Sequence, residues 1–275
     1  MSGGGVAGAA HIGFLMGLQE RGIRPRVLVG TSAGGIVAGF LAAGYTLPRL
    51  EQVFAEVSAH PAWYGLVDEA ENWILHHTLR EERGGLIDLA GLFARLLHGH
   101  QMAVADWSVG YGVTATDLLT GTTVLIARPG TRAALGRSLT TVEAVTATSA
   151  LPGLFCGVQT SDAFLVDGGV LDDSPYDSVQ TLAEQQGIAL DLILYLELRP
   201  QRGPLRPTPT EVVARTIDLL LAKANAERPT RTPVVHLRPE LPAGAGLFSF
   251  ALYPQLLAAG QRSARDWRPP ASAKP

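Results

Sequence analysis

The stretch VLVGTSAGGIVAGFLAAG, Val27–Gly44, decides the fold. An apolar run at Arg26–Val29 precedes Gly30, and a nearly all-apolar run at Ala33–Ala43 follows Ser32. A short apolar run before a glycine is typical of a buried strand, and a longer one that ends at a glycine is typical of a helix. The stretch therefore predicts a strand, a tight turn and a helix, as in α/β proteins whose sheet is covered on both faces.

The remaining chain continues this pattern of strands and helices. Further strands are predicted at Val109–Ala115, Thr123–Ala127, Phe164–Val166, Leu190–Leu196 and Val234–Leu237. Further helices are predicted at His11–Arg21, Leu50–Val57, Leu86–Leu97, Val142–Thr148, Ser178–Gln186 and Glu211–Ala226. We expect one domain over residues 1–275. Its core spans about 3–200, a C-terminal helix–strand–helix extension spans about 210–265, and residues 266–275 form a loosely held tail.

Composition narrows the functional classes. Of the 275 residues, 47% are hydrophobic and 17% are charged, which is typical of a chain with a large buried core. The net charge of −3 predicts no nucleic-acid partner. The single cysteine, Cys156, excludes an intramolecular disulfide and is expected to be a small buried residue. No signal peptide is visible and the apolar runs are too short to span a bilayer, so we expect a cytoplasmic protein with at most a peripheral membrane contact.

The pentapeptide GTSAG, Gly30–Gly34, fits the G-x-S-x-G pattern of a nucleophile elbow. In such an elbow a strand turns sharply into a helix and presents the serine, here Ser32, at the apex. The flanking glycines leave room for the strained turn, and the helix directs its positive dipole end toward developing negative charge. The strand before and the helix after favour a nucleophile over a packing turn.

A serine hydroxyl needs a base, and two candidates stand out. Asp167 lies where a predicted strand runs into Asp-Gly-Gly, followed by Gly168 and Gly169. His236 lies in a predicted strand, and Ser32, Asp167 and His236 follow the chain order of α/β-hydrolases. That fold places several strands before its elbow, however, so we interpret His236, like His11, as structural. From the residues alone, Asp167 is either a base or an ordinary turn aspartate.

The glycine loop GGGVAG at Gly3–Gly8 has the spacing G-x-G-x-x-G. A dinucleotide-binding unit needs an acid at the end of the next strand, but that strand ends in Gly30 and the elbow. The acid that would bind the ribose is therefore missing, which argues against a dinucleotide-binding loop. Beside an elbow, backbone N–H groups of such a loop can instead stabilise the oxyanion of a tetrahedral intermediate.

Three blocks of this sequence resemble the patatin-like phospholipases. They are SGGGVAGAAHIGFLMGL, VLVGTSAGGIVAGFLAAG and ATSALPGLFCGV…FLVDGGVLDDSPYD, with weaker matches in YGVTATDLLTGTTVLI and LLAAGQRSAR. The blocks occur in the family's order and cover nearly the whole chain. The chain is thereby identified as a member of that family.

The resemblance implies a three-layer α/β/α sandwich with a mostly parallel sheet and a Ser–Asp dyad that needs no histidine. It implies Ser32 as nucleophile, Asp167 as general base, and backbone amides at Gly3, Gly4 and Gly5 as the oxyanion hole. It also implies hydrolysis of carboxylic esters of lipids through an acyl-serine, with no metal or cofactor. Gly8, Gly30, Gly34, Gly168 and Gly169 complete the matching motifs. The alternative is a catalytically silent member with a binding or regulatory role, and the sequence leaves the oligomeric state open.

Two features depart from the family pattern. Ala7 stands where the family usually has Lys or Arg, which weakens the expectation of a phospholipid substrate. The apolar strand that usually leads into the glycine loop is missing, so either the true start lies upstream or the sheet has lost a strand. In the second case we expect a loop anchored on one side only. Aromatic residues within His60–Arg80 either pack into the domain, which we favour, or contact lipid.

Overall fold

The strand–turn–helix unit forms where the sequence predicts it. The computed structural model describes residues 1–61, 85, 87–98, 102–128, 138–198, 219 and 230–269. Within it, β1 (Leu28–Thr31) runs through Ser32 into α2 (Ala33–Ala42). The predicted helix Glu211–Ala226, apart from Leu219, and nearly all of the aromatic segment His60–Arg80 lie outside the described residues.

Most of the other described helices and strands agree with the predicted ones to within a few residues, whereas the sequence does not predict the short strand β4 (Val158–Gln159). The strands are β2 (Tyr111–Asp117), β3 (Thr122–Ala127), β4 (Val158–Gln159), β5 (Phe164–Asp167), β6 (Ile193–Leu196) and β7 (Val234–Leu237). The helices are α1 (Ala9–Glu20), α3 (Leu47–Ala59), α5 (Leu89–Leu96), α6 (Thr141–Ser149), α7 (Tyr176–Gln185) and α9 (Tyr253–Asp266). Short 3₁₀ helices include η1 (Gly5–Gly8) and η6 (Gly168–Val170).

The sheet is mixed, with fewer parallel pairs than the sequence predicts. Strands β1 and β2 are parallel, as are β6 and β7. Strand β2, however, is antiparallel to both β3 and β5, and β5 is antiparallel to β4. The β2–β3 connection, residues 118–121, is a tight turn. Such a turn can join only antiparallel neighbours, because a parallel pair needs a long crossover.

The first two residues lie between β1 and β6 and join the two sheets. The Met1 amino group donates to the Val29 carbonyl (3.0 Å), and the Thr31 amide donates to the Met1 carbonyl (3.0 Å). On the other side, the Ser2 amide donates to the Leu196 carbonyl (3.2 Å). The expectation of a loop anchored on one side only is therefore wrong. Met1 and Ser2 make strand-like backbone hydrogen bonds to β1 on one side and to β6 on the other.

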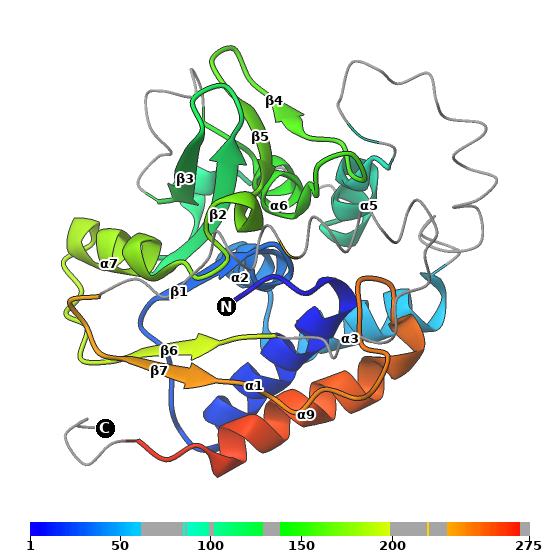
Figure 1. Ribbon diagram of the computed structural model, residues 1–275, viewed down its shortest axis with the longest axis vertical. Coiled ribbons are helices and arrows are strands. Elements are labelled where there is room, and N and C mark those ends of the chain that lie inside the picture. The colour runs from blue at the N-terminus through cyan, green and yellow to red at the C-terminus, as the bar shows by residue number, and fades with distance from the viewer. Residues whose placement is uncertain are drawn as a thin grey trace.

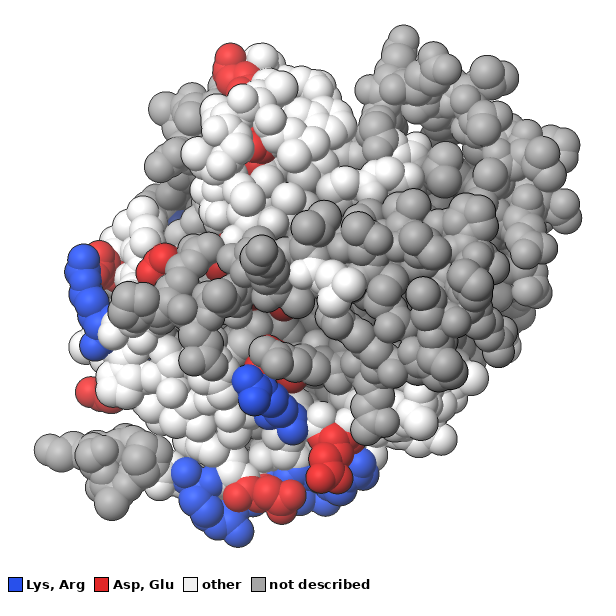
Figure 2. Space-filling model, in the orientation of Figure 1, with Lys and Arg blue, Asp and Glu red and all other residues white. Residues whose placement is uncertain are grey.

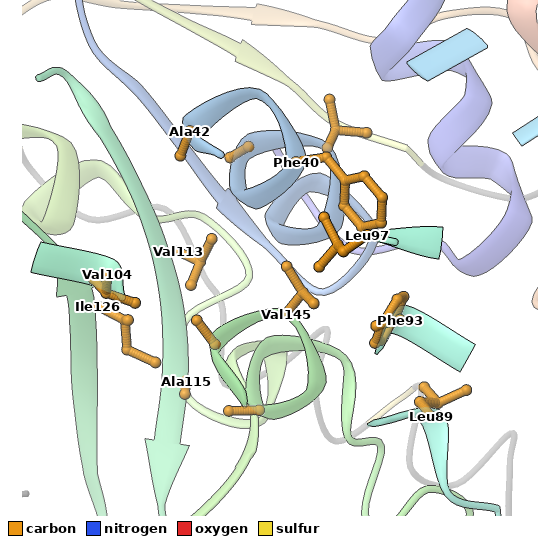
Figure 3. Close-up of a cluster of buried hydrophobic side chains, with 14 of the residues drawn as sticks. Phe40, Ala42, Leu89, Phe93, Leu97, Val104, Val113, Ala115, Ile126 and Val145 are labelled. Atoms are coloured by element: carbon orange, nitrogen blue, oxygen red, sulfur yellow. The ribbon is translucent and has the colours of Figure 1, made fainter. Parts of the chain in front are cut away.

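Helices cover the larger sheet on both faces (Figure 1). On one face, Val113 and Ala115 of β2 join a buried core with side chains of α2, α5 and α6, among them Phe40 and Val145 (Figure 3). On the opposite face, Leu182 of α7 packs against buried residues of β1 and β3. Burial of this core is the main stabilising contribution to the fold.

Helices α1 and α9 pack side by side at glycines (Figure 1). A Cβ atom on Gly13 of α1 would lie 2.0 Å from the Leu257 carbonyl oxygen. A Cβ atom on Gly260 of α9 would lie 1.9 Å from the Ala10 carbonyl oxygen. The two backbones can approach this closely only because both positions lack a side chain.

Charged side chains of both signs lie on the face of the molecule shown in Figure 2. Figure 2 shows Lys and Arg side chains intermixed with Asp and Glu side chains along the lower edge of this face. One such pair joins Arg265 of α9 to Glu20 of α1 at 3.5 Å. Among the described residues, no helix is both long enough and apolar enough to cross a bilayer.

Candidate active site

Ser32 occupies the strained turn between β1 and α2. Its backbone has φ 53° and ψ −121°, a conformation that residues with a side chain rarely adopt and that costs of the order of 1–3 kcal/mol. The turn is tight, since a Cβ atom on Gly30 would lie 2.0 Å from the Gly34 carbonyl oxygen. Strain of this kind is typical of a functional residue.

Asp167 ends β5 beside Ser32, and its side chain is buried. Its carboxylate accepts a hydrogen bond from the Ser32 hydroxyl and another from the Gly169 amide (2.8 Å). Burial raises the pKa of Asp167 to about 7, against the lowering effect of these two bonds, and the negative charge of Asp173 raises it further. The structure thus brings together the serine and the acid that the sequence singles out.

The glycine loop lies against the elbow. An ideal Cβ atom on Gly3 would lie 3.3 Å from Ser32 Cβ and 3.7 Å from Ser32 Oγ. Among the described residues, we find no hydrogen-bond acceptor for the amides of Gly4 and Gly5. These two amides follow Gly3, the loop residue that adjoins Ser32, and have donors to offer.

His11 holds the start of this loop in place. Its Nε2 lies 2.9 Å from the Ser2 carbonyl oxygen. Burial lowers the pKa of His11 to about 3, so the ring is neutral and Nε2–H donates to that carbonyl. The Ser2 carbonyl also accepts from the Gly34 amide (3.1 Å), which ties the loop to α2. In this structure His11 contacts the loop backbone, as a structural histidine does.

Asp173 is a member of the site that sequence reasoning does not single out. Its Oδ1 accepts a hydrogen bond from the Gly3 amide at 2.6 Å. The same oxygen would lie 3.7 Å from a Cβ atom on Gly169, beside Asp167. The only signal in the sequence is a pair of acids, Asp172 and Asp173, five and six positions after Asp167 in the same DGGVLDDSP segment. The site therefore contains two carboxylates.

His236 lies elsewhere. Its Nε2 is 3.1 Å from the Tyr176 hydroxyl, and its Nδ1 is 3.9 Å from Glu197 Oε2. Its ring packs edge-on against Tyr176 and Tyr195. Within the described part of the chain no contact joins His236 to Ser32 or Asp167, so the Ser–Asp–His order of α/β-hydrolases does not correspond to a triad in space.

Two smaller predictions concern single side chains. Cys156 is buried, as predicted, and its thiol lies 3.4 Å from the Gly85 carbonyl oxygen. Ala7 is fully buried and packs with Leu198 and Leu256. The position at which the family usually has a basic residue therefore faces the interior here, where a charge would be costly.

An apolar edge adjoins the glycine loop. The Val6 amide donates to the Leu247 carbonyl (3.2 Å), and Leu247 is so close to Gly5 that a Cβ atom there would lie 2.6 Å from its Cα. The next residue, Phe248, is 45% exposed, and its ring packs edge-on against Phe155. An exposed aromatic side chain is thus held beside the loop.

A family model and several known proteins are similar to this chain. The family model described as patatin-like phospholipase matches residues 1–179. An uncharacterized NTE family protein of Mycobacterium tuberculosis is 28% identical over 228 residues, which cover 81% of this chain and 55% of the relative. The uncharacterized protein YqhO of Bacillus subtilis is 31% identical over 190 residues, 63% of each chain. The chain thus spans about half to two thirds of the length of these curated relatives.

A search among solved structures also finds a neighbour. The crystal structure of VipD from Legionella pneumophila aligns with a TM-score of 0.43 and 14% sequence identity. The alignment covers 94% of this chain and 66% of that one.

Proposed function

Because the chain belongs to the patatin-like phospholipase family, we propose that it is a serine hydrolase of lipid carboxylic esters that acts through an acyl-Ser32 intermediate. One observation carries the proposal: the hydroxyl of the strained Ser32 donates a hydrogen bond to the buried Asp167 carboxylate. This pair is what nucleophilic catalysis requires, a weak nucleophile next to a positioned base.

In acylation, Ser32 Oγ attacks the ester carbonyl carbon while its proton passes to the Asp167 carboxylate. The carbonyl oxygen becomes an oxyanion, and in this proposal the backbone amides of Gly3, Gly4 and Gly5 stabilise it. When the intermediate collapses, the bond to the alcohol breaks and the leaving oxygen takes the proton from Asp167. The acyl group now forms an ester with Ser32.

In deacylation, a water molecule attacks the acyl-Ser32 carbonyl carbon and gives a proton to Asp167. Collapse of the second oxyanion breaks the bond to Ser32 Oγ, which recovers a proton from Asp167 as the carboxylic acid leaves. Asp167 is suited to both directions of transfer because its pKa of about 7 lies close to neutral pH.

A lipid ester is the substrate class that the surroundings favour. The exposed Phe248 and the adjoining Leu247 provide apolar surface next to the glycine loop, where an acyl chain attached to the reacting carbonyl would extend. In this proposal the protein therefore hydrolyses acyl esters of lipids and contacts a membrane at most peripherally.

The proposal is tested with a fluorophosphonate probe and a p-nitrophenyl ester. We expect the wild-type protein to be labelled at Ser32 and to hydrolyse the ester, and Ser32→Ala to lose both activities. Asp167→Asn should lower kcat/KM by about 10³-fold or more, because the base is removed. The matched controls Ser161→Ala and Asp162→Asn change exposed residues of the same types and should retain wild-type rates.

Two results would contradict the proposal. Labelling of Ser32→Ala at the wild-type rate would place the nucleophile elsewhere. A folded wild-type protein that is neither labelled nor active would support the alternative of a catalytically silent member with a binding or regulatory role.

A further inference from the structure

The Gly3 amide belongs to the proposed oxyanion hole, and it already has an anionic partner. Asp173 Oδ1 accepts its hydrogen at 2.6 Å, a distance typical of a strong, charge-assisted bond. The amide belongs to the residue whose added Cβ would lie 3.7 Å from Ser32 Oγ. A carboxylate thus occupies one donor of the proposed oxyanion hole.

Asp173 is held in this position from several sides. The Tyr195 hydroxyl donates to its backbone carbonyl (3.0 Å), and the hydroxyl of the next residue, Ser174, donates to that same tyrosine oxygen (3.1 Å). The segment is further tied down by Asp172, whose carbonyl accepts from the Thr31 hydroxyl (3.0 Å). The contact with Gly3 therefore belongs to an ordered turn.

The charges that face Asp173 make this contact consequential. In the part of the chain that the structure describes, they include the Met1 amino group, Asp167, the adjacent Asp172 and the Tyr195 hydroxyl. Burial lowers the pKa of the Met1 amino group to about 5, so it carries no positive charge at neutral pH. A developing oxyanion would consequently meet the negative charge of Asp173 at the donor that should stabilise it.

We propose that Asp173 is a positioning residue that competes with the reacting carbonyl for the Gly3 amide and so keeps the resting protein in a less active state. This inference rests on the proposed function, since it concerns the same oxyanion hole. On formation of the tetrahedral intermediate, the Gly3 N–H exchanges the Asp173 carboxylate for the substrate oxygen. No covalent bond to Asp173 forms or breaks.

The first test is Asp173→Asn, which retains an oxygen acceptor for the Gly3 amide but removes the charge. We expect kcat/KM for the p-nitrophenyl ester at pH 7 to rise by about three- to tenfold, because a neutral acceptor competes less strongly. An arylboronic acid, which forms a tetrahedral anion on Ser32, should bind about three- to tenfold more tightly for the same reason. The acidic limb of the pH profile should shift to lower pH, because the charge that helps to raise the pKa of Asp167 is gone.

Asp162→Asn is the matched control, since it removes one charge from an exposed loop and should change none of these values. If Asp173→Asn does not fold, as judged by thermal unfolding, Asp173→Ala removes the same charge and should show the same direction. A structure of the wild-type phosphonate adduct gives an independent readout. In it the Gly3 amide should donate to the phosphonate oxygen, with Asp173 Oδ1 beyond hydrogen-bond distance.

The outcomes separate the two proposals. A reactive wild-type protein whose rates and boronate affinity are unchanged or weakened in Asp173→Asn would overturn the role of Asp173 alone. An adduct in which Asp173 still accepts from Gly3 would do the same. If neither the wild type nor Asp173→Asn reacts, the proposed hydrolase function itself is overturned, and the inference with it.

Discussion

Asp167 is the residue whose protonation sets the working pH range of the proposed site. Burial raises its pKa to about 7, although its bonds with Ser32 and Gly169 oppose that shift. Such a base accepts a proton only when it is ionised. At the scale of the single residue, the environment of one carboxyl group therefore links activity and stability to pH.

The first consequence is a pH profile. We expect kcat/KM to rise with pH and to reach half of its plateau near pH 7, the value to which burial raises the pKa of Asp167. Initial rates of ester hydrolysis from pH 5 to 9 measure it. A profile that is flat across this range would mean that no group with this pKa acts in the reaction.

The raised pKa of Asp167 also makes the stability of the fold depend on pH, and stability falls with rising pH where activity increases. Because the folded pKa lies above the unfolded value, the stabilising contribution of Asp167 is present below about pH 4 and is lost as pH rises through about 7. We therefore expect Asp167→Asn to raise Tm at pH 8 by about 2 °C or more, and to change it less at pH 5. Differential scanning calorimetry at both values provides the comparison, and an equal change at the two would disprove the assignment.

Helices α1 and α9 show how one element positions another. Helix α1 follows directly from the glycine loop, and α9 packs against it through Gly13 and Gly260. The sequence indicates each helix separately. It does not show that they pair, because a glycine at a helix contact looks the same as any other small residue until the partner's backbone is placed against it.

This contact can be tested by adding one methyl group. Gly260→Ala would place Cβ 1.9 Å from the Ala10 carbonyl oxygen. We expect a loss of about 1–3 kcal/mol in the free energy of unfolding, together with lower kcat as α1 and the glycine loop shift. Urea unfolding and ester hydrolysis measure the two effects.

The control for this variant is Gly91→Ala in α5, since no atom lies within 4 Å of a Cβ atom there. Because alanine favours a helix over glycine, Gly91→Ala should gain about 0.5–1 kcal/mol. Destabilisation of both variants to the same extent would show that the α1–α9 contact is not special.

At the scale of the whole molecule, the sequence predicts the fold and the two central side chains but not the full site. The elbow is a short segment with strong local preferences, so Ser32 can be identified from residue types and spacing. Asp167 stays ambiguous on those grounds, and only the family resemblance singles it out as the base. The bond between Gly3 and Asp173 joins residues 170 positions apart, and it depends on how two loops meet in three dimensions. The mixed strand order is likewise determined by tertiary packing.

The placement of Met1 and Ser2 between the two sheets has a consequence for how the molecule loses structure. Within the described ranges, the few backbone hydrogen bonds that link β1 to β6 pass through these two residues. A region held by few hydrogen bonds opens at a lower free energy than a cohesive core, as a local rather than a global event. Ser32 and Gly3 both lie at this junction, because Ser32 follows β1 and Gly3 follows Ser2.

We therefore expect activity to be lost at a lower urea concentration than the far-UV circular dichroism signal. In native-state hydrogen exchange, the amides of Ser2 and Thr31 should exchange before the amide of Ala115 in β2. Coincident loss of activity and of helical signal would indicate instead a single cooperative unit. If activity is lost before the circular dichroism signal, a short exposure to mild denaturant would inactivate the protein reversibly while most of its hydrophobic core stays packed.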